Sequence, residues 1–239
     1  MAQSYSSRLV DRKQIAENTV TLYFERPAGF EFKAGQHINI KLSNLQFDDK
    51  KGARRTFTLS SAPHEPLLHI TTRLSESGYK RTLLEGPLQE VEFIGPMGDM
   101  VFDETLPAVF IAGGIGSTPF KSMILDALHR NVSQSVTLLY SNRYVGAAAF
   151  HELFKTLGKK HSTILKYVPT MPDEDQHKSV WSGETRFINN DFIRDYVDDM
   201  DKVMFYLCGP PTMVTSMHTV LEKESIDPTR IKSESFWGY

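Results

Sequence analysis

The chain has 239 residues, of which 40% are hydrophobic and 23% are charged, so it can bury a sizeable core and is neither disordered nor fibrous. Its 27 Lys and Arg nearly balance its 29 Asp and Glu, which gives no sign of a binder of nucleic acid or acidic membranes. Cys208 is the single cysteine, so an internal disulfide and an iron–sulfur cluster with four cysteine ligands are both excluded. We expect a cytoplasmic protein without a transmembrane segment, because the first residues lack the apolar core of a signal peptide and no apolar run approaches the ~18–20 residues that span a bilayer.

Short β-prone runs separated by turn residues fill the first half of the chain. One short helix is expected over Tyr79–Glu85. This rhythm predicts an antiparallel barrel or sandwich. The expected strands are Thr19–Glu25, Gln36–Ser43, Arg55–Ser60, Leu67–Leu74 and Glu90–Ile94.

From Pro107 onward the pattern changes to alternating strands and helices, which predicts a parallel sheet covered by helices. The change predicts two domains, residues 1–102 and 103–239. The segment Pro172–Gly183 is expected to be a surface loop. The expected elements are Ala108–Ala112, Pro119–Arg130, Ser135–Ser141, Ala147–Lys159, Thr163–Pro169, Asp191–Val197, Lys202–Cys208 and Pro211–Glu224.

A glycine-rich turn links the first strand of this second half to its first helix. Gly114 and Gly116 lack a β-carbon, so the backbone can approach a pyrophosphate, and the helix start favours the anion. Thr118 is expected to cap the helix, with Pro119 in its first position. The alternative is a plain tight turn, since Pro119 replaces the third glycine of the ordinary dinucleotide fingerprint.

A second turn, Cys208-Gly209-Pro210-Pro211, follows a late buried strand. Ligands of open α/β sheets bind beyond the carboxyl ends of strands, so both turns are expected to face one crevice. Taken alone, Cys208 is typical of a small buried hydrophobic residue.

The strand that begins at Arg55 alternates two kinds of side chain. Arg55 could clamp a phosphate, Phe57 could cover an aromatic ring, and Thr58 could bond a ring nitrogen. Periodicity alone favours a plain barrel strand with one polar face.

Taken together and in order, these motifs resemble those of the ferredoxin–NADP reductase family, most closely its stand-alone bacterial members without a fused iron–sulfur domain. The resemblance implies a six-stranded antiparallel barrel that holds a flavin, usually FAD and less often FMN, followed by an α/β domain for NADPH or NADH. The motifs that carry it are Phe32–Gln36, Arg55–Ser60, Gly95–Gly98, Ala112–Pro119, Leu139–Arg143, Cys208–Val214 and Glu234–Phe236.

The resemblance also implies roles for individual residues. Thr58, Glu234 and Cys208 are expected next to the reacting rings, with Arg55 on the flavin phosphates and Phe57 on the isoalloxazine. Trp237 or Tyr239 could shield the flavin. The remaining flavin contacts implied are Thr56, His69, Ile70, Thr71, Thr72, Ser77, Gly78, Tyr79, Lys80 and Phe236. Those implied for the nicotinamide dinucleotide are Gly114, Gly116, Thr118, Pro119, Ser141, Arg143, Cys208, Gly209, Pro210 and Pro211, with Ser141 and Arg143 favouring NADPH while remaining compatible with NADH.

The activity that the resemblance implies is hydride transfer between NAD(P)H and FAD, with electrons passed singly to a ferredoxin, a flavodoxin or an oxygenase component. One alternative is a reductase of free flavin or ferric chelates. Another is a flavin-binding electron-transfer subunit of a larger complex. A metal site is not expected, because the helix that begins His151-Glu152 lacks the second histidine of a zinc protease.

Overall fold

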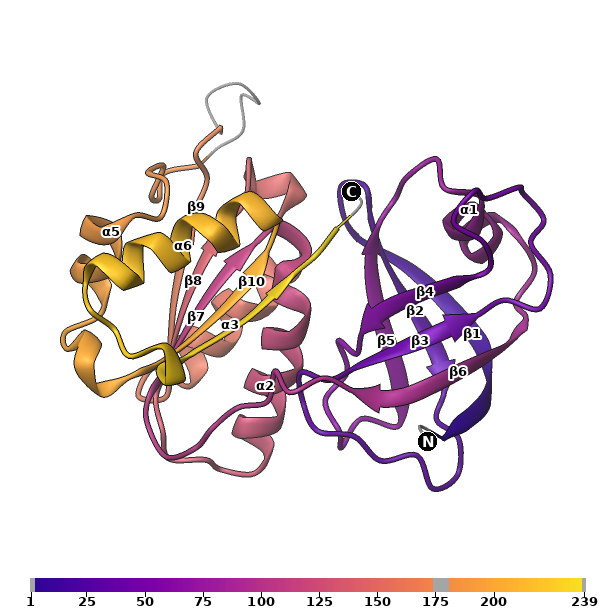
Figure 1. Ribbon diagram of the computed structural model, residues 1–239, viewed down its shortest axis with the longest axis horizontal. Coiled ribbons are helices and arrows are strands. Elements are labelled where there is room, and N and C mark those ends of the chain that lie inside the picture. Colours follow the sequence, from indigo (N-terminus) through magenta and orange to yellow (C-terminus); the bar gives the residue numbers. More distant parts are fainter. Residues whose placement is uncertain (1–2, 174–180, 238–239) are drawn as a thin grey trace.

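The computed structural model describes residues 3–173 and 181–237. Six antiparallel strands form the first sheet, in the order β4-β3-β6-β1-β2-β5. The two edge strands meet at a bridge between Leu59 and Ile70, which closes the sheet into a barrel. Helix α1 (Gly78–Glu85) lies across one end of it (Figure 1). The strands are β1 (Ser4–Ala16), β2 (Thr19–Glu25), β3 (His37–Lys41), β4 (Arg54–Thr58), β5 (Leu67–Arg73) and β6 (Glu90–Met97).

Five parallel strands form the second sheet, in the order β11-β10-β7-β8-β9. They are β7 (Ala108–Gly113), β8 (Val136–Ser141), β9 (Leu165–Thr170), β10 (Met204–Gly209) and β11 (Ile231–Ser235). Its helices are α2 (Ser117–His129), α3 (His151–Lys160), α5 (Asn190–Tyr196) and α6 (Pro211–Lys223), with short 3-10 turns η1 (Gly114–Gly116), η2 (Val145–Ala147), η3 (Met200–Lys202) and η4 (Pro228–Arg230). The predicted fold class, an antiparallel barrel followed by a parallel sheet with helices, is confirmed.

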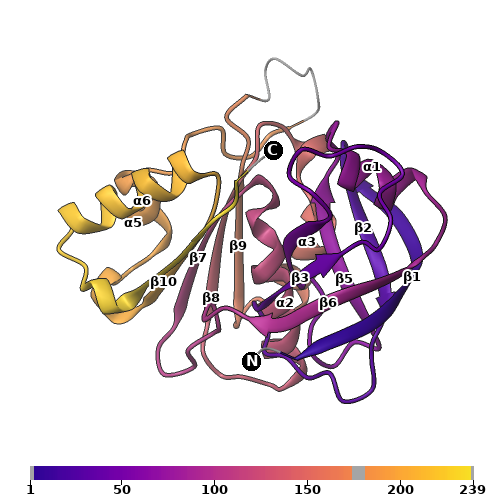
Figure 2. The same cartoon turned by 45° about the vertical axis from the view of Figure 1, so that its right-hand side comes forward.

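Three apolar cores follow from this layering. The barrel interior is filled by side chains such as Leu22, Ile40 and Phe93. Helices α2 and α3 bury one face of the parallel sheet and α5 and α6 bury the other, so the strands between them are apolar on both sides (Figure 2). Strand β10, for example, is buried along its whole length.

Helix α2 lies between the parallel sheet and the barrel and joins the two (Figures 1 and 2). The buried ammonium of Lys121 donates to the carbonyl of Ser60 at 2.8 Å, and the Ser122 hydroxyl donates to the carbonyl of Ser61 at 2.5 Å. Ser60 and Ser61 directly follow the strand that carries the predicted flavin motif. The helix that starts at the glycine turn therefore fixes the position of that strand.

The predicted start of α2 is wrong by two residues. Thr118 is not the N-cap and Pro119 is the third helical residue, because Gly116 already has helical dihedral angles (φ −61°, ψ −5°) and the helix continues directly from η1. The Thr118 hydroxyl instead donates to the carbonyl of Ile115 at 3.1 Å.

Other expectations concern the borders of the two halves and the membrane. The first sheet ends at Met97 and the second begins at Ala108, while the predicted boundary at residue 102 stays a prediction. The expected loop at 172–183 and the suggested role of Tyr239 fall partly or wholly outside the described residues. Within residues 3–173 and 181–237, none of the helices combines the length and apolarity needed to cross a bilayer.

Candidate active site

A cavity of about 780 Å³ runs from the barrel to the glycine turn of the parallel sheet. This volume lies in the range of sites that bind small molecules and cofactors. Ile115 and Thr118 from the second half line it together with barrel residues, so the cavity spans the junction between the two sheets. The barrel residues in its wall include Arg55, Thr56, Phe57, Thr58, Thr71, Thr72, Ser77, Gly78 and Lys80, all of which are predicted flavin contacts.

Strand β4 supplies the central wall of this cavity. Phe57 packs partly against the barrel core, with its ring centroid 6.0 Å from that of Tyr79. Phe57 also lines the cavity. Thr58 is buried yet lines the cavity. Four successive residues, Arg55 to Thr58, line the cavity, whereas alternation alone predicts that only every second residue does so.

The start of α1 supplies an end wall rich in hydrogen-bond donors. Ser77 caps the helix by accepting from the Lys80 amide at 3.3 Å. The Lys80 ammonium is buried and donates to the carbonyl of Arg73 at 2.9 Å. Its pKa is lowered to about 8, by desolvation and then by the neighbouring cations Arg55 and Lys51. This wall therefore concentrates positive charge.

The two glycine turns of the parallel sheet touch through their backbones. A Cβ on Gly116 would lie 2.2 Å from the carbonyl oxygen of Cys208, and one on Gly209 would lie 3.0 Å from the Gly113 nitrogen. The strand register places Gly113, Ser141 and Thr170 side by side at the carboxyl edge of the sheet. The predicted nucleotide-binding segments thus gather at one edge, with Pro210 and Pro211 at the start of α6.

Arg73, which sequence reasoning missed, reaches this edge from the barrel. Its guanidinium donates to the carbonyl of Ala147 at 2.9 Å and to Asn142 Oδ1 at 3.4 Å. A Cβ on Gly114 would lie 3.7 Å from Arg73 Nη2. Gly114 has a left-handed φ of +54° and leaves room above the turn. The guanidinium also donates to the carbonyl of Glu17 at 3.2 Å and to Thr19 Oγ1 at 2.9 Å. Among the described residues Arg73 has no carboxylate partner, so its positive charge is not neutralised at the turn.

The end of the chain returns to the cavity along β11. Glu234 and Phe236 line it, and the Glu234 carboxylate lies 3.6 Å from His37 Nδ1. Trp237 also lines the cavity with a side chain that is 82% exposed. Glu234 and Phe236 at the end of the chain therefore share one cavity with Thr58 of β4.

Of the predicted flavin contacts, His69, Ile70 and Tyr79 do not line this cavity, and of the predicted dinucleotide contacts only Thr118 does. The other nine are Gly114, Gly116, Pro119, Ser141, Arg143, Cys208, Gly209, Pro210 and Pro211. Ile70 is fully buried in the barrel core, and Tyr79 is buried with its hydroxyl donating to the carbonyl of Ile40. His69 packs edge-on against Tyr23, with ring centroids 4.7 Å apart, near Glu65. Cys208 is fully buried, and this burial, aided by Glu234, raises the pKa of its thiol. A buried neutral thiol is a packing group in this structure.

The burial of His69 makes the free energy of unfolding depend on pH. Burial lowers the pKa of His69 to about 4. The nearby Lys121 cation lowers it further, whereas the Glu65 carboxylate raises it. Because the unfolded state takes up the proton first, this contribution is complete above about pH 6.5 and is lost as the pH falls toward 4. We expect His69→Gln to remove about 2 kcal/mol of the stability difference between pH 7 and pH 4. Urea unfolding at pH 7 and pH 4 measures this difference. An equal difference in H69Q and in the unaltered protein would contradict the role given to His69.

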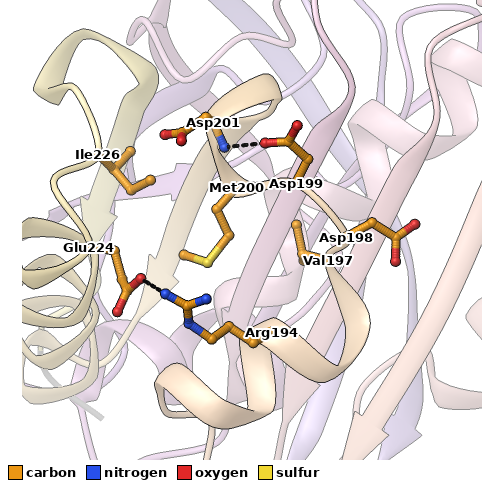
Figure 3. Close-up of a pocket in the computed structure, with 8 residues that line it drawn as sticks. All are labelled: Arg194, Val197, Asp198, Asp199, Met200, Asp201, Glu224 and Ile226. Carbon is orange, nitrogen blue, oxygen red and sulfur yellow. Dashed lines mark hydrogen bonds and ion pairs between the residues drawn. The ribbon is translucent and has the colours of Figure 1, made fainter.

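A smaller cavity of about 260 Å³ lies at the opposite edge of the parallel sheet (Figure 3). Its walls come from residues 197–201, which precede β10, and from residues that follow α6. Arg194 there is paired with Glu224, and the Asp201 amide donates to Asp199 (Figure 3). Since ligands of such sheets bind at the carboxyl edge, we assign no role to this cavity.

Comparison with known proteins agrees with this geometry. Residues 110–219 match the family described as oxidoreductase NAD-binding domain. The phenol hydroxylase P5 protein of Acinetobacter pittii is 28% identical over 99% of this chain, which spans 66% of that relative's length.

Solved structures show the same fold. The cytochrome b5 reductase domain of Ulva prolifera nitrate reductase matches with a TM-score of 0.81 at 19% identity, over 97% of each chain. A ferredoxin NADP+ reductase from Neisseria gonorrhoeae, solved with bound FAD and NADP, matches with a TM-score of 0.78 at 19% identity, over 99% of this chain and all of that one. The predicted resemblance is confirmed.

Proposed function

We propose that the chain is a member of the ferredoxin–NADP reductase family and an FAD-dependent oxidoreductase that takes electrons from NADPH or NADH. The observation that carries the proposal is the single cavity that joins the β4 motif to the glycine turn at Ile115 and Thr118. Electron transfer between two bound cofactors requires their rings to meet, and a shared cavity allows this.

The residues of the cavity fit a flavin nucleotide. Its cationic end, with Arg55 and buried Lys80, suits phosphate. Its middle offers the Phe57 ring together with the hydroxyls of Thr58 and Thr72. An aromatic face next to hydroxyl groups suits a flat ring system with polar edges.

The protein's own contribution is positioning. When bound, FAD accepts a hydride from the nicotinamide and releases the electrons one at a time. Phe57 would lie against the flavin ring, Thr58 would offer a hydroxyl to it, and Arg73 would hold the dinucleotide at the Gly114 turn. Glu234 lines the same cavity, with its carboxylate 3.6 Å from His37 Nδ1.

Ser141 ends β8 and Arg143 follows it by two residues, so both lie at the carboxyl edge of the sheet, where they can meet the ribose of the dinucleotide. Arg143 is exposed, and a guanidinium there favours the extra phosphate of NADPH. We therefore expect NADPH to be the better donor, with NADH also used.

A protein acceptor completes the reaction. The relative named phenol hydroxylase P5 protein favours an oxygenase component, with ferredoxin or flavodoxin as the other candidates. The exposed Trp237 at the cavity mouth offers a surface close to the flavin. A cytoplasmic location suits the single free cysteine, which is buried.

Removing the Thr58 hydroxyl tests the proposed role of β4. We expect Thr58→Ala to slow flavin reduction by NADPH about fivefold, because a lost hydrogen bond is worth about 1 kcal/mol, with little change in dinucleotide affinity. Stopped-flow absorbance measures both quantities. Thr58→Ser, which keeps the hydroxyl, should restore the rate. Equal reduction rates in T58A and the unaltered protein would remove this role.

A further inference from the structure

Asp49 places a carboxylate at the start of helix α1, inside the end wall of the cavity. Its side chain is only 6% exposed. One oxygen accepts from the Ser77 hydroxyl at 2.7 Å and from the Tyr79 amide at 2.9 Å. The other accepts from the Arg55 guanidinium at 2.6 Å and from the Lys51 amide at 2.8 Å.

These donors are of the kinds that bind phosphate. An amide in the first turn of a helix, a hydroxyl and a guanidinium together favour a bound anion. The hydrogen bonds, first of all those from Ser77 and the Tyr79 amide, hold the pKa of Asp49 far below its usual range, so its carboxylate is charged. Asp49 therefore already satisfies the donors that a phosphate would need.

The surrounding cations give the site a positive charge that can bind an anionic ligand. Lys80 is buried beside Arg55 and Lys51, and both of these cations lower its pKa. Among the described residues Lys80 has no carboxylate partner and donates only to the carbonyl of Arg73. A buried ammonium that faces other cations is stabilised when an anion enters the cavity.

The loop that carries Asp49 is seated on α1 by specific contacts. The amides of Gln46 and Phe47 donate to Thr82 Oγ1 at 3.1 and 3.4 Å, and the Arg81 guanidinium lies 3.8 Å from the centre of the Phe47 ring. A Cβ on Gly78 would lie 2.1 Å from the carbonyl oxygen of Asp48, so the loop can approach only because residue 78 is glycine. These contacts define the position of Asp49 before any ligand arrives.

We propose that Asp49 is an internal occupant of the flavin phosphate site, and that the phosphate of the flavin displaces its carboxylate on binding. The inference rests on the proposed flavin site. Binding then takes place only in the fraction of molecules in which Asp49 has left its donors, so the apparent affinity is lowered by that fraction. Asp49 sets how tightly the protein holds its flavin.

The first test compares two substitutions that remove the same charge from the same loop. Asp49→Asn has one acceptor oxygen in place of two, so it cannot accept from both the Arg55/Lys51 pair and the Ser77/Tyr79 pair of donors, whereas Asp48 is exposed and its side chain holds none of these donors. With flavin removed from the whole 239-residue chain, D49N should bind FAD about tenfold more tightly, as expected when the free site is raised from roughly a tenth to most of the molecules. D48N should stay within about twofold of the unaltered protein.

Flavin fluorescence quenching measures these affinities, and riboflavin provides a second arm. Riboflavin lacks the phosphate, so its affinity should be the same in D49N and in the unaltered protein. Weaker or equal binding of FAD to D49N, an equal gain in D48N, or an equal gain for riboflavin would each overturn the proposal. If none of the proteins binds any flavin, it is the proposed function that fails.

A measurement on the unaltered chain does not depend on how the variant folds. Hydrogen exchange of the Lys51 amide should become faster when FAD binds, because that amide loses Asp49, while the Tyr79 amide stays protected by the phosphate that replaces it. Unchanged protection of both amides would show that Asp49 keeps its place.

Discussion

Gly116→Ala is expected to disrupt the dinucleotide site. The added Cβ would lie 2.2 Å from the carbonyl oxygen of Cys208, 2.5 Å from its carbon and 2.7 Å from the Gly209 nitrogen. All three are backbone atoms, so the two turns must move apart. We expect a loss of about 1–3 kcal/mol in the free energy of unfolding. Flavin reduction by NADPH should slow about 100-fold, because a displacement of about 1 Å of bound groups has effects of that size.

Gly146→Ala is the matched control. A Cβ there meets nothing closer than 3.5 Å, at the Tyr144 ring, and the residue does not have a left-handed φ. Its stability and reduction rate should stay close to those of the unaltered protein. Thermal unfolding and stopped-flow absorbance compare the two variants. If G116A binds and oxidises NADPH normally, the contact between the turns has no part in the site.

Lys121→Met is expected to loosen the junction between the barrel and the parallel sheet. The Lys121 ammonium is buried, donates to the carbonyl of Ser60 and lies 3.5 Å from Glu65. Methionine keeps most of the volume but leaves that carbonyl and carboxylate without their cation. We expect a loss of about 2–4 kcal/mol in the free energy of unfolding, together with slower flavin reduction because Ser60 lies two residues after Thr58, the last residue of β4.

Lys155→Met separates this effect from the general loss of a charge. Lys155 is exposed and lies 3.6 Å from the exposed Glu152, and such pairs contribute less than about 0.5 kcal/mol. Denaturant unfolding of K121M and K155M gives the comparison. Equal stability of the two variants would show that the Lys121 contact does not hold the two sheets together.

Strands with a strong apolar pattern were predictable, whereas the polar strands β1 and β11 were not. Strand β1 was missed because its sequence, SYSSRLVDRKQIA, buries only Ser7 and Leu9 well. Strand β11 was missed because an edge strand with the sequence IKSES has no fully buried position. Both are recognised as strands only through their partners, β2 and β6 for the first and β10 for the second.

The candidate site was predictable where motifs mark it. The β4 motif and the glycine turn lie in or beside the cavity as expected. Asp49, Arg73 and Lys121 were not found, because each acts through contacts with residues far away in the sequence, such as Ser77, Ala147 and Ser60. Ile70 was a predicted flavin contact, yet it belongs to the barrel core, since a strand buries alternate residues.

The visible absorption spectrum of the purified protein, followed by anaerobic titration with NADPH and then with NADH, tests the central claim most directly. The account predicts flavin absorption bands that bleach on addition of the reduced dinucleotide, with NADPH effective at the lower concentration. A protein that carries no flavin and binds neither added FAD nor added FMN would contradict it.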